Sequence, residues 1–333
     1  MPETSLVLFI LVVLLAIGFG LSNGFNDAAN AVATVIGTRV LSPRNAVIMA
    51  AFLNFLGAAT GLEVARTIGK GILVPEAMTF LTVVAGLSSA VIWVTLATYY
   101  GLPLSVTHSL IAGLAGAGIA VMGIGTVQWA TMVRVLASVV IAPVLGFVAG
   151  FILMVILYWV FRRSTSSRVQ AIFGKLQIIS AAFMAYSHGK NDGQMPIGVI
   201  TMALVIYTGQ NELWDNIPLW VIVLSSLSIS LGTIVGGWRV IKTLGVKVTT
   251  LRPVQGFAAE TSGATVIEVA SLLGIPVSTT HCITTAIMGV GATRRFSAVR
   301  WGVASNIVAA WIFTFPICAG LGYLFAWVMK SVL

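Results

Sequence analysis

The chain has 333 residues, of which 58% are hydrophobic and only 8% are charged. A soluble protein carries about 25% charged residues, so this composition excludes an ordinary soluble domain and predicts a membrane protein. The net charge of +9 does not indicate nucleic-acid binding, because the basic residues lie in loops between apolar runs. The two cysteines, Cys282 and Cys318, lie in apolar stretches and do not indicate a disulfide framework.

Long uncharged segments recur along the whole chain. Residues 135–161, for example, form a run of 27 residues without a charge, and about 20 apolar residues cross the hydrocarbon core of a bilayer. The first apolar run lacks the basic start and the cleavage site of a signal peptide, so we predict that it is a retained helix. A β-barrel would show short alternating segments instead. The pattern therefore predicts an all-α polytopic membrane protein.

Counting the apolar runs predicts about five crossings in each half of the chain, or about 10–12 transmembrane segments. In chain order the predicted spans are 4–38, 45–62, 79–100, 103–123, 129–161, 172–207, 217–238, 255–274, 276–293 and 299–331. The first and the sixth span contain Asn-Asp pairs, and we expect both to be broken helices. Residues 79–123 and 255–293 have an alternative reading as re-entrant hairpins.

Three landmarks recur in the same order in the two halves. Each landmark of the first half has a counterpart of similar sequence in the second half. The pairs of segments are 24–27 with 189–192, 66–69 with 242–245, and 101–108 with 274–281. The last pair, Gly-Leu-Pro-Leu-Ser-Val-Thr-His and Gly-Ile-Pro-Val-Ser-Thr-Thr-His, matches at five of eight positions. The offsets of 165, 176 and 173 are similar, so they indicate one duplication with small insertions.

The charges of equivalent loops indicate that the two repeats have opposite orientations. The loop after the first Asn-Asp pair carries Arg39 and Arg44, whereas its counterpart, residues 208–216, has two acids and no basic residue. Residues 239–252 hold four basic residues where residues 63–76 hold two acids and two bases. Basic loops face the cytoplasm, so equivalent loops lie on opposite sides of the membrane.

We therefore predict a first inverted repeat over residues 1–161, a basic cytoplasmic linker over 162–175 and a second inverted repeat over 176–333. Both termini are then outside. Two inverted-topology repeats with broken or re-entrant helices are typical of secondary transporters, whose binding site lies near the middle of the membrane.

Two of the acidic residues inside predicted spans, Asp27 and Asp192, occupy equivalent positions in the repeats. A carboxylate at the bilayer centre costs at least about 2.5 kcal/mol, so such groups face a cavity or a partner. Glycines beside them would allow local unwinding, which frees backbone carbonyls. With neighbouring asparagines these groups offer oxygen ligands to sodium, and the predicted cation-site residues are Asn23, Asn26, Asp27, Asn191 and Asp192. The alternative is a helix cap or an ion pair between Asp192 and Lys190.

The repeated Pro-x-Ser-x-Thr-His element indicates a site for an anion. Proline opens helices, and serine and threonine cap helix N-termini. A helix that starts inside the membrane at this element offers free N–H groups and the positive end of its dipole. The predicted anion ligands are Ser105, Thr107, Ser278, Thr279 and Thr280. The alternative is a proline-kinked helix whose hydroxyls bond to backbone carbonyls.

Five further polar residues lie in apolar segments. His108 and His281 follow the hydroxyls, and each is either a neutral core histidine or a residue that takes part in coupling. Glu260 is the better candidate for a functional acid, whereas Glu268 is expected to pair with a nearby base. Asn54 lies in the second predicted span, where it would complete a polar cavity or form a hydrogen bond between helices.

Three motifs of the chain resemble those of the inorganic phosphate transporter (Pit) family. They are Gly-x-Asn-Asp-x-x-Asn-Ala at 24–31, His-Gly-x-Asn-Asp at 188–192, and Gly-[Leu/Ile]-Pro-[Leu/Val]-Ser-[Val/Thr]-Thr-His at 101–108 and 274–281. The resemblance runs from about Ser22 to Phe315, nearly the whole chain. It implies symport of inorganic phosphate with sodium, or with protons while carrying metal–phosphate complexes, by inverted repeats in a homodimer. Related bacterial members move sulfate.

When the family's motifs are matched position by position to this sequence, the resemblance implies cation binding and coupling by Asn26, Asp27, Asn191 and Asp192. It implies phosphate contacts by Ser105, Thr107, Ser278, Thr279 and Thr280. Some members have a glutamate where this chain has Asn54, so no acid-based role is implied there, while Glu260 keeps its acid. Gln194 and Met195 depart from the small polar run after the first Asn-Asp pair, so the two cation half-sites are not identical.

The sequence therefore predicts a secondary active symporter that imports inorganic phosphate with sodium by alternating access. We expect no enzymatic activity and no cofactor apart from sodium as the coupling ion. The expected partners are phosphate, sodium or protons, the lipids of the cell membrane and a second copy of the chain. Alternatives within the family are a proton-coupled phosphate or metal–phosphate symporter and a sulfate permease. An anion channel is less compatible with buried acids, and a membrane enzyme would need catalytic groups outside the repeated motifs.

Overall fold

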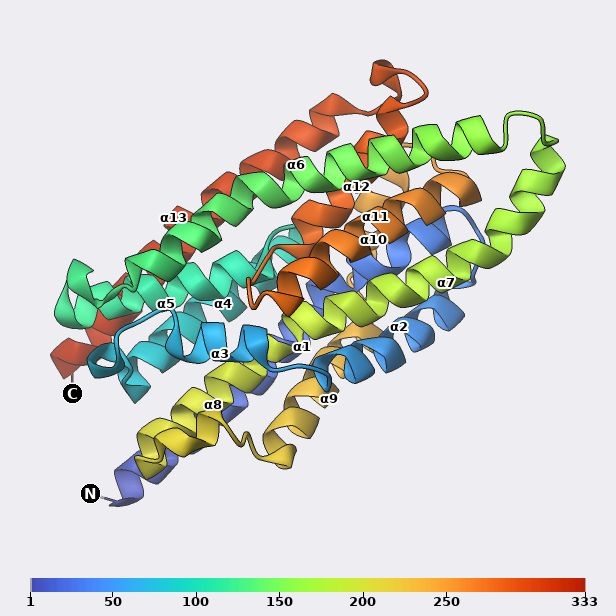
Figure 1. Cartoon of the computed structure of the whole chain (residues 1–333). Helices are drawn as coiled ribbons and strands as arrows, with labels where there is room; N and C mark the ends of the chain where they lie inside the picture. Colours follow the sequence, from blue (N-terminus) through green and yellow to red (C-terminus); the bar gives the residue numbers. More distant parts are fainter. Residues whose placement is uncertain (1, 333) are drawn as a thin grey trace.

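The computed structural model describes the backbone of residues 2–332 and the side chains from residue 5 onwards, and this part of the chain is almost entirely helical (Figure 1). The α-helices of the first half are α1 (Pro2–Gly37), α2 (Pro43–Ala58), α3 (Glu63–Lys70), α4 (Phe80–Tyr100), α5 (Val106–Met122) and α6 (Trp129–Val160). Those of the second half are α7 (Ser166–Asp192), α8 (Gln194–Thr208), α9 (Leu219–Val235), α10 (Trp238–Lys242), α11 (Pro253–Leu272), α12 (Thr279–Ala292) and α13 (Trp301–Val332). The all-α prediction is confirmed.

By length and apolarity, fewer segments qualify as complete spans than the sequence count predicted. Five segments of the described chain qualify, namely α1 from Ser5, α4, α6, α7 with α8, and α13. The bent pairs α2 with α3 (71°) and α9 with the helical turns up to Lys247 (62°) raise the count to seven. The difference arises largely because α5 and α12, with 17 and 14 residues, are shorter than a bilayer-crossing helix.

The short helices belong to two antiparallel hairpins, α4 with α5 and α11 with α12. The loops that join them, residues 101–105 and 273–278, form two tips that meet inside the molecule. At this meeting point the Thr107 Oγ1 donates to the Val277 carbonyl oxygen at 3.2 Å. Because α5 and α12 begin in the interior, they need not cross a bilayer, and the geometry favours the re-entrant alternative.

Equivalent elements of the two halves make equivalent contacts. The Thr67 hydroxyl donates to the Gly274 carbonyl at 2.7 Å, and its counterpart Thr243 donates to the Gly101 carbonyl at 3.1 Å. Both glycines have a left-handed backbone, with φ of 66° and 70°. Likewise α13 packs on α5, and α6 packs on α12 (Figure 1). These paired contacts support the inverted repeat, and they show that the last helix of each half covers the hairpin of the other half.

The expectation of two broken spans is wrong for the first of them. Helix α1 continues through Gly24 without interruption, whereas the second span breaks at Gly193, between α7 and α8. Gly24 permits close packing instead, because a Cβ atom there would lie 2.1 Å from the Ile229 carbonyl oxygen. Gly189 plays the same part, with a Cβ position 2.2 Å from the Asn54 carbonyl oxygen. These two glycines bring helices together, and they do not free backbone carbonyls for a cation.

The opposite orientation of the repeats can be tested at two exposed loop positions. We expect the Ser42→Cys side chain to be protected from an impermeant thiol reagent added outside intact cells, because its loop is basic. The Gln210→Cys side chain, in the acidic counterpart loop, should be labelled. Both native positions are exposed, so burial does not explain a difference. Labelling of both cysteines from the same side would contradict the inverted repeat.

Candidate functional site

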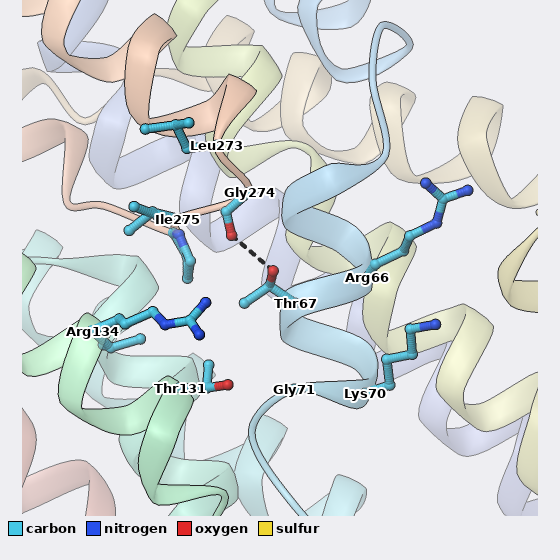
Figure 2. A pocket seen from close by; sticks show the side chains of 11 residues that line it. Arg66, Thr67, Lys70, Gly71, Thr131, Arg134, Leu273, Gly274 and Ile275 are labelled. Carbon is cyan, nitrogen blue, oxygen red and sulfur yellow. Dashed lines mark hydrogen bonds between the residues drawn. The ribbon is translucent and has the colours of Figure 1, made fainter.

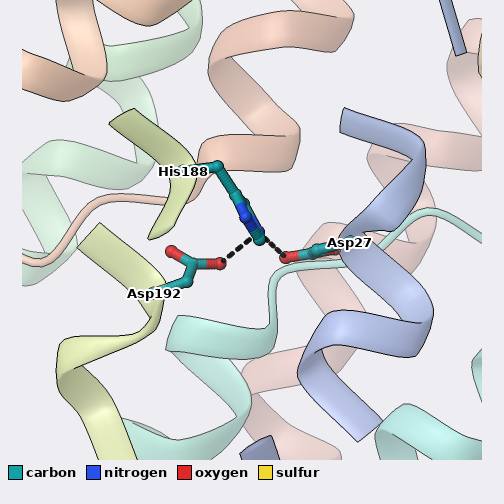
Figure 3. A group of neighbouring side chains, drawn as sticks. All are labelled: Asp27, His188 and Asp192. Atoms are coloured by element: carbon teal, nitrogen blue, oxygen red, sulfur yellow. Dashed lines mark ion pairs between the residues drawn. The ribbon is translucent and has the colours of Figure 1, made fainter. Parts of the chain in front are cut away.

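Three buried, ionisable side chains meet at the centre of the molecule, namely Asp27 of α1 with His188 and Asp192 of α7 (Figure 3). The His188 Nε2 atom lies 3.3 Å from the Asp192 Oδ2 atom and 4.0 Å from the Asp27 Oδ2 atom. One potential ligand atom from each residue lies within 4.8 Å of the other two. The structure thus brings together the two aspartates that hold equivalent repeat positions.

His188 is the member of this group that sequence reasoning missed as a site residue. It stands four residues before Asp192, so helical periodicity puts both side chains on one face of α7. The repeat offset of 165 maps His188 onto Asn23, which in turn precedes Asp27 by four residues. This correspondence with a predicted ligand was the signal that could have identified the histidine.

The hydrogen bonds around His188 assign its tautomer when the ring is neutral. The Thr233 hydroxyl donates to the Ile229 carbonyl at 2.9 Å, so it accepts the bond from the Asn54 Nδ2 atom at 2.9 Å. The Asn54 Oδ1 atom then faces the His188 Nδ1 atom at 2.9 Å, and this nitrogen must carry the proton. The Nε2 lone pair is therefore directed toward the two carboxylates, where it can bind a cation or accept a proton.

Two of the predicted phosphate ligands contact the aspartates directly. The Thr280 Oγ1 donates to Asp27 at 3.0 Å, and the Thr279 Oγ1 donates to Asp192 at 3.1 Å. The Asn30 Nδ2 atom donates to both hydroxyl oxygens, at 2.9 Å for Thr280 and 3.1 Å for Thr279. Asn30 was part of a recognised motif but not of the predicted site. Hydrogen bonds thus connect the start of α12 to the carboxylates of α1 and α7.

The predicted asparagine ligands have several different environments. The Asn26 Nδ2 atom donates to the Thr98 hydroxyl at 2.7 Å, and Asn191 donates to the Val277 carbonyl at 2.8 Å. These two residues therefore hold the ends of the hairpins. Asn23 is fully buried, and no atom of the described chain forms a hydrogen bond with its amide. A buried amide without a partner needs a bound water or an ion.

The predicted serine ligands cap the two helices that start at the centre. The Ser105 Oγ accepts from the His108 N–H at 3.1 Å, and the Ser278 Oγ accepts from the His281 N–H at 3.2 Å. Their hydroxyl protons remain available as donors. The first N–H groups of each helix have no acceptor within the helix, and the dipole makes this end positive. Two such ends meet here, so the centre can also hold an anion.

The buried acid Glu260 lies apart from this group. Its carboxylate accepts hydrogen bonds from Thr34, Ser180 and Gln177, and no basic residue of the described chain pairs with it. Thr34 continues the polar face of α1 one turn beyond Asn30. Glu260 is thus connected to the central site along α1, and it does not contact the aspartates.

Lys190 pairs with Glu268 rather than with Asp192. The prediction that Glu268 pairs with a nearby base is therefore confirmed, and the alternative in which Lys190 neutralises Asp192 is not observed. His108 and His281 pack on each other, with ring centroids 5.1 Å apart. Neither histidine forms an ion pair with an aspartate, so the arrangement agrees with core residues beside the hairpin tips and supplies no direct contact for coupling.

A pocket of about 350 Å³ lies against the tip of the second hairpin (Figure 2). Its floor is formed by Leu273, Gly274, Ile275 and Pro276, and α3 and α6 form its walls. In Figure 2 the Arg134 side chain points into the pocket, whereas those of Arg66 and Lys70 point away from it. None of the described residues that line the pocket is acidic, so its charge attracts anions.

The fold and the site together define a polytopic membrane protein with related halves and a buried polar centre between them, the arrangement typical of transport proteins. The sequence model of the phosphate transporter family matches residues 23–322. The chain therefore belongs to this family, and it is a transport protein rather than an enzyme.

Similar proteins cover nearly the whole chain. A probable low-affinity inorganic phosphate transporter of Rhizobium meliloti (strain 1021) is 44% identical, over 95% of this chain and 96% of its own. One of Bacillus subtilis (strain 168) is 39% identical, over 99% of both chains. A solved structure of a sodium-dependent phosphate transporter is 29% identical with a TM-score of 0.88, and the match covers 98% of this chain and 100% of that one.

Proposed function

We propose that this protein is a symporter that imports inorganic phosphate together with sodium by alternating access. One observation carries the proposal: Asp27 and Asp192 converge with the Nε2 atom of His188 at the point where the starts of α5 and α12 meet. The similarity to a sodium-dependent phosphate transporter supports it. We further propose that both termini lie outside the cell and that two copies form a homodimer.

The carboxylates would bind the cation. Two aspartates this close together repel each other, and the described chain provides no lysine or arginine that pairs with either. A cation between their oxygens removes this repulsion, and the His188 lone pair adds a ligand. The residues present therefore fit a monovalent cation without any change of fold.

The helix starts would bind phosphate. The hydroxyls of Ser105 and Ser278 and the first N–H groups of α5 and α12 are donors without a fixed charge, so the anion can leave again. Thr279 and Thr280 contact the aspartates, so an anion here lies beside two carboxylates. Like charges about 4 Å apart repel by ~4 kcal/mol at an effective dielectric constant of about 20. Phosphate binding therefore requires the cation, which is the basis of coupling.

The pocket that contains Arg134 would deliver phosphate to this site. Its floor, residues 273–276, leads directly into Val277 and Ser278, which belong to the centre. The Thr67–Gly274 hydrogen bond closes one side of this floor (Figure 2). Release of that bond would let the tip move, and the equivalent Thr243–Gly101 bond would serve the opposite face.

The imidazole in the ligand set favours a second candidate function, which is symport of a metal–phosphate complex. Imidazole nitrogen suits transition metals, whereas carboxylates bind sodium and divalent ions alike. In this alternative the metal is cargo and travels with phosphate. Phosphate uptake that needs a divalent metal and not sodium would support it.

Removing one serine hydroxyl at a helix start tests the phosphate site. A hydrogen bond to a charged ligand is worth roughly 1.5–3 kcal/mol, so Ser105→Ala and Ser278→Ala should each raise the phosphate Kd by about 10- to 150-fold. Equilibrium binding of labelled phosphate at saturating sodium measures this. Thr107 and Thr280 are less suitable positions, because their hydroxyls already donate to Val277 and Asp27.

Ser42→Ala provides the matched control. Ser42 caps α2 and accepts from the Asn45 N–H at 3.3 Å, but it lies in a surface loop. The control loses a cap worth about 0.5–2 kcal/mol, as the test variants do, and should keep the wild-type phosphate Kd. Unchanged phosphate affinity in both test variants would leave the serines as helix caps only.

A further inference from the structure

A second basic pocket, of about 220 Å³, lies at the opposite end of α6 from Arg134. It is formed by the end of α6, the starts of α7 and α11, and the segment after α12. Three of its lining residues are arginines from three separate parts of the chain, namely Arg162, Arg252 and Arg294. Its lining residues within the described part of the chain include no acid.

Among the residues that the structure describes, these arginines have no partner of opposite charge. The ion pairs within the described residues are those of His188 with the two aspartates and of Lys190 with Glu268, and none of them involves an arginine. Arg162, Arg252 and Arg294 are also exposed. Three guanidinium groups around one small pocket repel each other, so an anionic group between them is stabilising.

The other half of the pocket is apolar. Leu157 and Tyr158 belong to the last turns of α6, and Phe161 follows directly after them. Between Arg134 and this end, α6 carries no charge. Trp159, on the same turns, is 65% exposed, and the Arg162 guanidinium lies 5.0 Å from its ring centroid. Aromatic and basic residues at the end of an apolar helix mark the membrane–water interface. The pocket thus joins an apolar wall to a cluster of arginines at the depth of lipid headgroups.

We propose that this pocket binds the phosphodiester headgroup of an anionic phospholipid. The arginines bind the phosphate oxygens, while the acyl chains follow the exposed apolar face of α6 toward Val155 and Ile152. A lipid bound here bridges α6, α7 and α11, because each of these helices lines the pocket. This site is separate from the proposed transport site and does not depend on its function.

The test compares two triple variants of the full-length protein in a neutral detergent. Arg162→Gln/Arg252→Gln/Arg294→Gln removes the cluster, and Arg163→Gln/Arg168→Gln/Arg295→Gln removes three exposed arginines that do not line the pocket. Native mass spectrometry measures retention of phosphatidylglycerol, with phosphatidylcholine as the neutral lipid. We expect the first variant to bind phosphatidylglycerol at least about tenfold more weakly, and the second to bind it as the wild type does.

Three outcomes would overturn the proposal. Equal loss in both triple variants would mean that the net surface charge attracts the lipid. Equal retention of phosphatidylcholine and phosphatidylglycerol by the wild type would mean that the headgroup charge is not recognised. Displacement of phosphatidylglycerol by millimolar inorganic phosphate would assign the pocket to free phosphate. If the triple variant does not fold, the single variants Arg252→Gln and Arg294→Gln are compared with the wild type in the same lipid-retention measurement. Wild-type retention of phosphatidylglycerol by both single variants would also reject the proposal.

Discussion

Asp27→Asn and Asp192→Asn are each expected to reduce sodium-dependent phosphate uptake to background while the protein remains folded and inserted. Each substitution keeps the shape of the side chain and removes one of the two charges that converge on His188. Without that charge the cation loses a ligand, and the phosphate beside it loses the positive charge that offsets the remaining carboxylate. Uptake of labelled phosphate into proteoliposomes measures the effect.

Asp215→Asn is the control for these two variants. It is the same substitution at an exposed position of the loop after α8, outside the central group of Asp27, His188 and Asp192. It should retain wild-type uptake. If either central variant transports phosphate at the wild-type rate under limiting sodium, that aspartate does not belong to the coupling site.

Gly189→Ala is expected to have the second large effect, on both stability and uptake. A Cβ atom at this position would lie 2.2 Å from the Asn54 carbonyl oxygen, so α2 and α7 must move apart. Overpacking of this kind typically costs about 1–3 kcal/mol. Gly189 follows His188 directly in the chain. The same movement therefore lengthens the hydrogen bond between Asn54 and His188. We expect a lower Tm in detergent and reduced uptake.

Gly174→Ala is the control, because Gly174 lies on the same helix as Gly189. It distinguishes a clash at the helix contact from a general effect of replacing glycine by alanine. Apart from its chain neighbours and its own helix backbone, no atom of the described residues lies within 4 Å of a Cβ built at Gly174. Alanine favours a helix over glycine by about 1 kcal/mol, so this control should keep or slightly raise the Tm. A Gly189→Ala protein as stable and active as the wild type would show that the α2–α7 contact tolerates the extra methyl group.

The features that the sequence predicted well are those that a duplication repeats. The equivalent placement of Asp27 and Asp192 led to the expectation that the two carboxylates converge, and the structure has them together at His188. The repeated Pro-x-Ser element likewise predicted two helix starts inside the molecule, which α5 and α12 provide. Two related halves that pack around a common axis bring equivalent positions together, so the repeat contains three-dimensional information.

Other features could not be read from the sequence because one residue type serves two physical purposes. Gly24 is compatible with an unwound helix and with close helix packing, and only the position of α9 decides between them. Thr280 can donate to a phosphate or to a carboxylate, and in the structure it donates to Asp27. Apolarity alone also does not distinguish a crossing helix from a re-entrant hairpin. These choices depend on tertiary contacts that the local pattern does not record.

The most direct test of sodium-coupled phosphate transport is uptake into proteoliposomes with sodium and pH gradients imposed separately. We predict that an inward sodium gradient at equal pH drives accumulation of labelled phosphate, that a proton gradient without sodium does not, and that excess sulfate competes poorly. Accumulation driven by the proton gradient alone, with no response to sodium, would contradict the assignment of Asp27 and Asp192 as a sodium site.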